Sequence, residues 1–452
     1  MPERAMDDPA ARSAPHASPG ILIIGGGFAG LEAAKELGDA GLGATIVDRQ
    51  NHHLFQPLLY QVATAALSAP DIAEPIRKVL RGRASVQVLL GEVVEIDAGT
   101  RSVRLADSSR LPYDYLLLAA GATHGYFGND GWATIAPGLK TLADARSIRS
   151  KVLLAFERAE RTIDPVEQQR LITVAVIGGG PTGVELAGSI AELSRYTLAR
   201  DFRNIEPARA RIMLIEAGPR LLSTFSEELS AYAEARLAAL GVEVLTGTRV
   251  EAMGETWIRI SGRVEPVGVH LWAAGVAASP LARQLGVEVD RAGRVPVDAN
   301  LEVEGRPGVF ALGDLASCPG PDGRPLPGLA QVAKQQGRHL GRSLAAHIRD
   351  GRPLQPFVYR GRGNTAIVGR HAAVFEQGRF RIRGGLAWLA WAIIHVYLLV
   401  GFQHRIQVSL QWLWRYLTYE RGARLVSDDP APVPEPARGN EASRSRLGRG
   451  ED

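Results

Sequence analysis

The chain carries the glycine-rich stretch Gly25-Gly26-Gly27-Phe28-Ala29-Gly30, and a second stretch of the same kind lies at Gly178-Gly179-Gly180-Pro181-Thr182-Gly183. Each stretch follows an apolar run that predicts a buried strand and precedes a run of small residues that predicts a helix. An acid closes the next predicted strand in both places, Asp48 in the first and Glu216 in the second. The two copies together predict two Rossmann-like units in one chain.

Each part of this pattern has a physical role in holding a dinucleotide. The first glycine permits a tight turn, the second lets the backbone approach a pyrophosphate, and the third lets the helix pack closely on the strand. The acid accepts a hydrogen bond from a ribose hydroxyl, and the helix N-terminus carries the pyrophosphate charge. One such stretch is weak evidence, but two with strand, helix and acid in register indicate two dinucleotides and electron transfer between them.

The composition narrows the function further. The 452 residues are enough for two or three domains, and 46% of them are hydrophobic, which supplies large cores. The net charge of +4 is modest, and no block of basic residues interleaved with aromatic ones suggests nucleic acid. Cys318 is the only cysteine, which excludes an internal disulfide and a redox-active cysteine pair. No metal cluster is expected, and scattered histidines such as His52 and His53 are expected in loops or on the surface.

Further candidate contacts lie in the second half of the chain. Asp314 follows the short apolar run that begins at Val309, and an acid there can hydrogen-bond the polyol chain of a flavin. Taken alone, this run is better explained by a turn acid, but the two glycine-rich stretches upstream favour the flavin. Gln331 and Gln335 share one face of a predicted helix, so their neutral amides could bond the carbonyl oxygens of a flavin or a quinone. A solvated helix face explains that spacing about as well.

The C-terminal region has the pattern of a membrane-surface segment. Residues 384–404 lack Asp, Glu, Lys and Arg and meet the lower length of a membrane-spanning helix, but His395 and Tyr397 interrupt the run. We therefore expect this segment to lie on a bilayer rather than cross it. A core-capping or dimerisation helix is the alternative. The next predicted helix carries an apolar stripe, and tryptophans and arginines flank it. The stripe consists of Ile406, Leu410, Leu413 and Leu417.

With these residues in view, the chain resembles the type II NADH:quinone oxidoreductases, single-subunit respiratory enzymes that do not pump protons. The resemblance extends from about residue 20 to residue 426 and rests on both glycine-rich stretches and on residues 51–61, 121–128 and 136–140. It also rests on the A-Q-x-A-x-Q pattern at 330–335 and on the tryptophan- and arginine-rich C-terminus. These last two features are far more selective than the glycine-rich stretches, which a broad flavoprotein superfamily shares.

The resemblance implies an α/β fold with two Rossmann-like dinucleotide-binding domains, in the arrangement of glutathione reductase, plus a C-terminal membrane-anchoring helical region. It implies hydride transfer from NADH to non-covalently bound FAD, then transfer of two electrons to a membrane quinone. The protein would lie peripherally on the cytoplasmic face of the inner (plasma) membrane, and its C-terminal helices could also serve a homodimer. The expected division is a disordered tail (1–19), an FAD-binding domain in two parts (20–150 and 280–349), an inserted NADH-binding domain (151–279), the membrane-anchoring region (350–426) and a second disordered tail (427–452).

The resemblance also assigns site residues. Glu216 should repel a 2′-phosphate and so favour NADH over NADPH, although Arg220 could soften that preference. Ala29 stands where the family more usually has glycine, and it is small enough to leave FAD binding intact. The sequence alone favours Glu185 as a first-turn helix acid stabilised by the helix dipole, but the resemblance places it where NADH meets the flavin, as a candidate proton relay to the quinone. Gln331 and Gln335 would lie near the flavin and the quinone headgroup. FAD would contact Gly25, Gly27, Phe28, Ala29, Gly30, Asp48, Gln56, Val93, Ala120, Gly121 and Asp314. The NADH site would be lined by Gly180, Pro181, Thr182, Gly183, Glu185, Glu216, Ala274 and Gly275.

Three other functions fit parts of the pattern. A sulfide:quinone oxidoreductase shares the architecture, but its chemistry needs paired cysteines and this chain has only Cys318. A soluble NAD(P)H-dependent flavoprotein reductase would leave the apolar C-terminal segments without a purpose. A membrane-bound redox sensor that uses its flavin to report NADH levels stays open, and quinone-dependent turnover would separate it from an enzyme.

Overall fold

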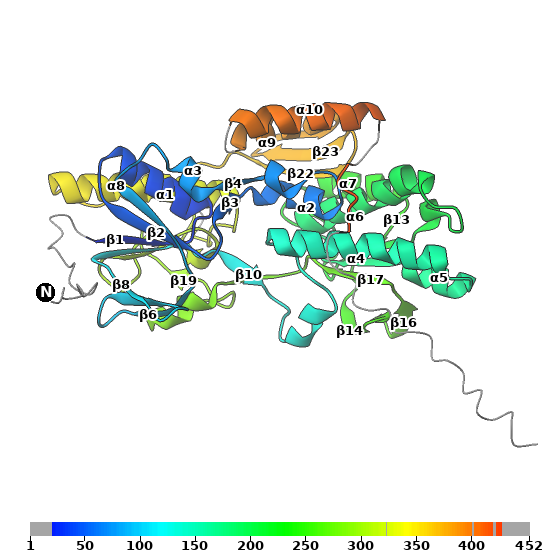
Figure 1. Cartoon of the computed structure of the whole chain (residues 1–452), viewed down its shortest axis with the longest axis horizontal. Helices are drawn as coiled ribbons and strands as arrows, with labels where there is room; N and C mark the ends of the chain where they lie inside the picture. The colour runs from blue at the N-terminus through cyan, green and yellow to red at the C-terminus, as the bar shows by residue number, and fades with distance from the viewer. Residues whose placement is uncertain (1–19, 322, 400–401, 419–421, 427–452) are drawn as a thin grey trace, which may run out of the picture.

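The computed structural model describes residues 20–321, 323–399, 402–418 and 422–426 (Figure 1). The two tails predicted to be disordered, and the side chain of Leu417 in the predicted apolar stripe, lie outside the described residues.

The first half of the chain forms a parallel sheet whose centre is entirely apolar. The strand β1 (Ile21–Ile24) is buried along its whole length, as expected for a parallel strand covered on both faces. The sheet has the order β20-β9-β1-β2-β5. Its other strands are β2 (Ala44–Asp48), β5 (Val86–Leu90), β9 (Tyr115–Leu118) and β20 (Val309–Ala311). The chain therefore returns to this sheet after a long excursion, because β20 pairs in parallel with β9.

The excursion builds a second parallel sheet on the same plan. The order is β13-β12-β11-β17. The strands are β11 (Val174–Ile177), β12 (Ile212–Ile215), β13 (Val242–Leu245) and β17 (Val269–Trp272). The helices of this half are α4 (Leu142–Arg161), α5 (Pro165–Leu171), α6 (Pro181–Glu192) and α7 (Glu227–Ala239). Thr141 caps the N-terminus of α4 by accepting a hydrogen bond from the backbone N–H of Asp144.

Both halves add a three-stranded antiparallel meander, so the duplication extends beyond the sheets. The meanders are β6 (Val93–Asp97), β7 (Ser102–Leu105) and β8 (Arg110–Pro112), then β14 (Val250–Gly254), β15 (Trp257–Ile260) and β16 (Arg263–Pro266). Two short strands, β10 (Ala122–His124) and β18 (Val276–Ala278), pair antiparallel where the chain passes between the halves. The strand β10 lies between the two sheets in Figure 1.

The stretch of residues 51–61, whose period fits neither an ordinary helix nor an ordinary strand, forms short elements. It contains β3 (His52–Leu54), a 3-10 turn at residues 56–58 and the start of α2 (Leu59–Ala63). The strand β3 pairs with β4 (Ala73–Pro75), which leads into α3 (Ile76–Val79). A second short parallel pair joins β19 (Val295–Pro296) and β21 (Ala316–Ser317).

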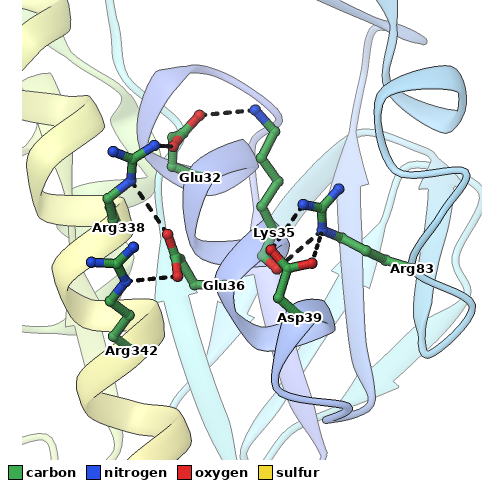
Figure 2. A network of polar contacts seen from close by, with 7 residues as sticks. All are labelled: Glu32, Lys35, Glu36, Asp39, Arg83, Arg338 and Arg342. Carbon is green, nitrogen blue, oxygen red and sulfur yellow. Dashed lines mark hydrogen bonds and ion pairs between the residues drawn. The ribbon is translucent and has the colours of Figure 1, made fainter.

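Two helices, α1 (Phe28–Asp39) and α8 (Ala330–Asp350), cross closely beside the first sheet. A side chain at Gly337 would collide with the backbone of Ala29, so this glycine permits the close approach. Figure 2 shows the ion pairs around the crossing, where Arg338 contacts Glu32 at 2.9 Å and Glu36 at 3.3 Å.

Burial acts to raise the pKa of Glu32, but neighbouring positive groups outweigh it. Lys35 Nζ lies 2.8 Å from the carboxylate. The hydrogen bond from Lys35 and the charges of Lys35, Lys334 and Arg338 hold the pKa of Glu32 below its ordinary value. The helix that follows the first glycine-rich stretch is thus fixed to α8 by packing and by paired charges.

The C-terminal region forms an antiparallel sheet covered by two helices. The elements are β22 (Asn364–Gly369), β23 (Ala372–Gln377), β24 (Phe380–Gly384), α9 (Gly385–Leu398) and α10 (Phe402–Thr418). Figure 1 shows α9 and α10 at the outer edge of the molecule, above β22 and β23. None of the helices in the described residues combines the length and the hydrophobicity that spanning a bilayer requires. The apolar run at 384–404 is thus divided between two helices.

Candidate active site

Most of the residues assigned to FAD lie at one edge of the first sheet. The glycine-rich stretch follows β1, Asp48 ends β2, Ala120 and Gly121 follow β9, and Asp314 follows β20. The sheet order places β2 on one side of β1 and β9 on the other. This is the point where strand order reverses, and ligands of open parallel sheets bind there, beyond the carboxyl ends of the strands.

The glycines of the first stretch have different roles. Gly25 has φ +101°, which favours glycine, and a side chain at Gly30 would collide with the carbonyl oxygen of Gly25. A Cβ at Gly27 would meet no atom within 4 Å. No side chain among the described residues caps the N-terminus of α1 at Gly27. The space over Gly27 and the uncapped N–H groups fit the phosphates of a dinucleotide.

The second stretch repeats this geometry. Gly178 has φ +111°, and a side chain at Gly183 would collide with the carbonyl oxygen of Gly178. Gly180 faces open space in the same way as Gly27, and α6 also lacks a capping side chain within the described chain. Pro181 and Thr182 are exposed at the start of α6. Ala274 and Gly275 follow β17 at the same edge, so the structure brings the residues assigned to NADH together.

The two acids hold the glycine-rich loops as well as facing the predicted ribose positions. Asp48 Oδ2 accepts a hydrogen bond of 2.6 Å from the backbone N–H of Gly26. Glu216 Oε2 accepts the equivalent bond of 2.6 Å from Gly179, and its Oε1 accepts another of 2.6 Å from Gly218. Burial raises the pKa of Asp48, against the lowering effect of its backbone hydrogen bonds. These carboxylates are therefore preoriented before any ribose is present.

A further residue at the first site, His53, was not predicted from the sequence. His53 is buried, and its Nδ1 lies 3.0 Å from the carbonyl oxygen of Gly26, so the expectation of a loop or surface position was wrong. Burial lowers the pKa of His53 to about 4. The ring is thus neutral at pH 7, and Nδ1–H donates to Gly26 because a carbonyl can only accept. The edge-on ring of Phe28, 5.0 Å away, completes the support of the loop. His53 lies on β3, which is held in place by its pairing with β4.

Glu185 lies on α6 and is partly buried. The backbone N–H of Ile367 on β22 donates a long hydrogen bond of 3.4 Å to its Oε1. Burial raises the pKa of Glu185 to about 8, and the hydrogen bond from Ile367 lowers it only in part. The side chain is therefore mostly protonated at pH 7. An acid with such a pKa is suited to giving up a proton at neutral pH.

The two glutamines assigned to the flavin and quinone both bond to backbone groups. Gln331 Nε2 donates to the carbonyl oxygen of Gly363 at 2.9 Å. Gln335 Nε2 donates to the carbonyl oxygen of Arg360 at 3.0 Å, and its Oε1 accepts from the Arg360 N–H at 3.1 Å. These amides tie the start of α8 to the segment before β22. Their contact with a flavin or a quinone stays a prediction.

Other predicted contacts surround the first site. Gln56 Nε2 lies 3.4 Å from the carbonyl oxygen of Lys140, and Lys140 Nζ lies 3.7 Å from Asp314 Oδ2. Val93 is buried at the start of β6. The neighbouring Gln336, which the sequence did not single out, accepts a hydrogen bond of 2.7 Å from the N–H of Gly313. In the part of the chain that the structure describes, no group of three metal-ligating side chains is found.

Each parallel sheet carries a glycine-rich loop, an acid and a helix without a capping side chain among the described residues. We call these loops the first cradle (residues 25–30) and the second cradle (residues 178–183). Together they define an oxidoreductase that binds two dinucleotides. A family model described as pyridine nucleotide-disulphide oxidoreductase matches residues 19–337. The chain is 42% identical to the type II NADH:quinone oxidoreductase Ndh of Mycobacterium tuberculosis, with 91% of each chain covered. It is 32% identical to the demethylphylloquinone reductase NdbB of Synechocystis, with 89% of this chain and 97% of that one covered.

A solved structure agrees in fold. NDH2 from Plasmodium falciparum, solved in complex with NADH, superposes with a TM-score of 0.84 at 21% identity, covering 91% of this chain and all 100% of that one. The resemblance inferred from the sequence is confirmed. The chain belongs to the type II NADH:quinone oxidoreductases, within the pyridine nucleotide-disulphide oxidoreductase family. The disulphide of that family description has no counterpart here, because Cys318 is the only cysteine.

Proposed function

We propose that the chain oxidises NADH and reduces a membrane quinone, with FAD held non-covalently in the first cradle and NADH in the second. The observation that carries this function is the pair of dinucleotide cradles in a chain 42% identical to a type II NADH:quinone oxidoreductase. When bound, FAD supplies the ring that takes a hydride from NADH and passes two electrons to a quinone, without proton pumping.

The residues of the chain then have three tasks. The glycine-rich stretches and the N-termini of α1 and α6 bind the two pyrophosphates. Asp48 and Glu216 orient the loops and accept from ribose hydroxyls. A quinone needs two protons along with its two electrons, and the protonated Glu185 is our candidate for supplying one of them.

NADH should be preferred to NADPH. A 2′-phosphate would meet the carboxylate of Glu216, which is held by Gly179 and Gly218 and cannot turn away without losing both bonds. The guanidinium of Arg220 donates to the carbonyl oxygens of Phe225 at 2.6 Å and Ser223 at 3.0 Å. Arg220 could weaken the preference for NADH over NADPH only by breaking those bonds.

Steady-state kinetics of the purified protein test this function. With a short-chain quinone supplied we expect rapid NADH oxidation, and with quinone withheld we expect only slow turnover. NADPH should give kcat/KM at least about tenfold lower than NADH, because like charges would meet at Glu216. Slow NADH oxidation at a rate that does not depend on quinone would instead support the redox-sensor alternative. Equal rates with NADH and NADPH would contradict the role of Glu216.

The two C-terminal helices present an apolar face that we assign to a lipid bilayer surface. On its inner side α10 is fixed: Trp412 Nε1 donates to Gln61 Oε1, and Gln407 Nε2 donates to the buried Asp71 Oδ1, both at 2.9 Å. Many exposed apolar side chains on two neighbouring helices are typical of partner or membrane contact. The exposed apolar side chains are Leu386, Leu389, Ile393, Tyr397, Ile406, Leu410, Leu413 and Trp414. The cytoplasmic side of the membrane and the homodimer stay predictions.

Replacing Leu410 and Leu413 together by glutamate should release the protein from lipid. Both side chains are exposed, so folding is expected to tolerate the change, while burying two charges in the lipid interface is unfavourable. In vesicle flotation we expect the partition coefficient to fall by at least about tenfold. FAD content should not change. Val264→Glu is the matched control, because Val264 is also exposed but lies on β16. Unchanged flotation of the double variant would contradict the assignment.

A further inference from the structure

An exposed aromatic ring stands beside the second cradle. Phe127 leaves 74% of its surface exposed. Its backbone has φ +52°, in the left-handed region that bulky residues rarely adopt. Holding a large side chain in this conformation costs free energy, and such residues cluster at ligand-binding sites where the surrounding structure enforces them.

The loop around Phe127 is firmly held. Trp272 Nε1 donates a hydrogen bond of 3.0 Å to the carbonyl oxygen of Gly125. The ring of Tyr126 is buried and stacks on Trp272 with 5.0 Å between centroids, and its hydroxyl donates to the carbonyl oxygen of Ala136 at 3.0 Å. The residue before Phe127 is therefore anchored in the interior. Because Tyr126 is held in this way, the ring of Phe127 points outward in one direction.

The ring lies over the turn that ends β17. A Cβ added to Gly275 would stand 2.8 Å from Phe127 Cζ, so ring and glycine are in contact. In the sheet order β13-β12-β11-β17, the strands β17 and β12 lie on opposite sides of β11. Gly275 follows β17, and Glu216 follows β12. Because the acid marks the adenosine ribose, Gly275 and Phe127 lie toward the other end of the dinucleotide.

We propose that the Phe127 ring packs against the nicotinamide end of NADH and contributes to its affinity and orientation. This inference rests on the proposed assignment of NADH to the second cradle. A flat apolar ring suits this end of the molecule, because the reduced nicotinamide is uncharged and aromatic side chains stack well on flat rings. Phe127 is a positioning residue in this proposal and takes no part in proton or electron transfer.

The test compares Phe127→Asn, Phe127→Tyr and the wild-type holoenzyme. Asparagine tolerates the left-handed backbone and removes the ring, whereas tyrosine keeps it. The dissociation constant for NADH comes from the concentration dependence of anaerobic flavin reduction in a stopped-flow instrument. We expect Phe127→Asn to raise it about tenfold and Phe127→Tyr to leave it within about twofold of wild type. FAD content, Tm and KM for quinone should stay unchanged. Phe380→Asn is the control, since that ring is also exposed but lies on β24.

Each other outcome overturns the proposal in a distinguishable way. An unchanged dissociation constant in Phe127→Asn, with a wild type that still oxidises NADH, refutes the inference and leaves the proposed function standing. A lower Tm together with lost FAD shows that the ring only fills space over Gly275. A raised KM for quinone alone places the ring at the quinone site. A wild-type flavin that NADH does not reduce refutes the proposed function itself.

Discussion

Gly30→Ala is expected to abolish FAD binding, while Gly27→Ala leaves the fold intact. The added methyl at Gly30 would collide with the carbonyl oxygen of Gly25, which is backbone and cannot turn aside. Relief requires α1 to move away from β1, at a cost of about 1–3 kcal/mol or more for overpacking. We expect the ratio of flavin to protein absorbance to fall at least about tenfold, together with a lower Tm.

The control at Gly27 separates folding from binding. Its methyl meets no protein atom within 4 Å, so the apoprotein should keep the Tm of the wild-type apoprotein. The same methyl would stand where the backbone approaches the pyrophosphate, so the dissociation constant for FAD should still rise. Full FAD content in Gly30→Ala would contradict the assignment of the first cradle.

The same comparison at the second cradle assigns the two dinucleotides. A methyl at Gly183 would collide with the carbonyl oxygen of Gly178. If NADH binds there, Gly183→Ala should keep its FAD but resist reduction by NADH. A variant that loses FAD and still binds NADH would reverse our assignment.

The second large effect is expected from Glu185→Gln, which should slow quinone reduction about a hundredfold. Glutamine has nearly the same shape, is neutral, and can still accept the hydrogen bond from Ile367, but it cannot give up a proton. Anaerobic reduction of the flavin by NADH should proceed normally, so the loss is confined to the quinone step. Glu227→Gln, at an exposed acid in the first turn of α7, is the control.

The proposed role of Glu185 also predicts how the rate of quinone reduction changes with pH. Since the pKa of Glu185 is about 8, the proton is present at pH 7 and is lost above pH 8. The wild-type quinone step should therefore slow as the pH rises through about 8, and Glu185→Gln should lack this limb. Desolvation disfavours the ionised form of Glu185 in the folded protein, so the wild type should also lose stability relative to the variant as the pH rises from about 5 to about 8. Equal turnover of both proteins across this range would refute the role of Glu185.

Much of the catalytic frame could be predicted from local pattern. The glycine turn, the apolar strand before it and the acid after the next strand occupy short segments, so their spacing alone identified both cradles. The cysteine count alone excluded disulfide chemistry. The A-Q-x-A-x-Q pattern identified the start of α8, but not that Gln335 would bond the backbone of Arg360, since the partner lies 25 residues away.

Other features could not be predicted because they depend on contacts between distant residues. His53 lies on β3, which is held in place by its pairing with β4. The pKa of Glu185 is raised because the packing of distant segments around α6 removes water from its carboxyl group. The left-handed backbone at Phe127 has no signal in the sequence. It follows from Tyr126 and Trp272, which anchor the loop from two parts of the chain.

The two Rossmann-like units, the acid of each and the amphipathic character of the C-terminal helices could all be predicted from the order of the residues. Those properties arise from residues within one or two turns of each other. The packing of α10 against distant segments makes Leu410 and Leu413 face outward, while Val408 is buried and Trp412 donates a hydrogen bond to Gln61. A periodic pattern defines the stripes of a helix, but the partner surface determines which stripe is buried.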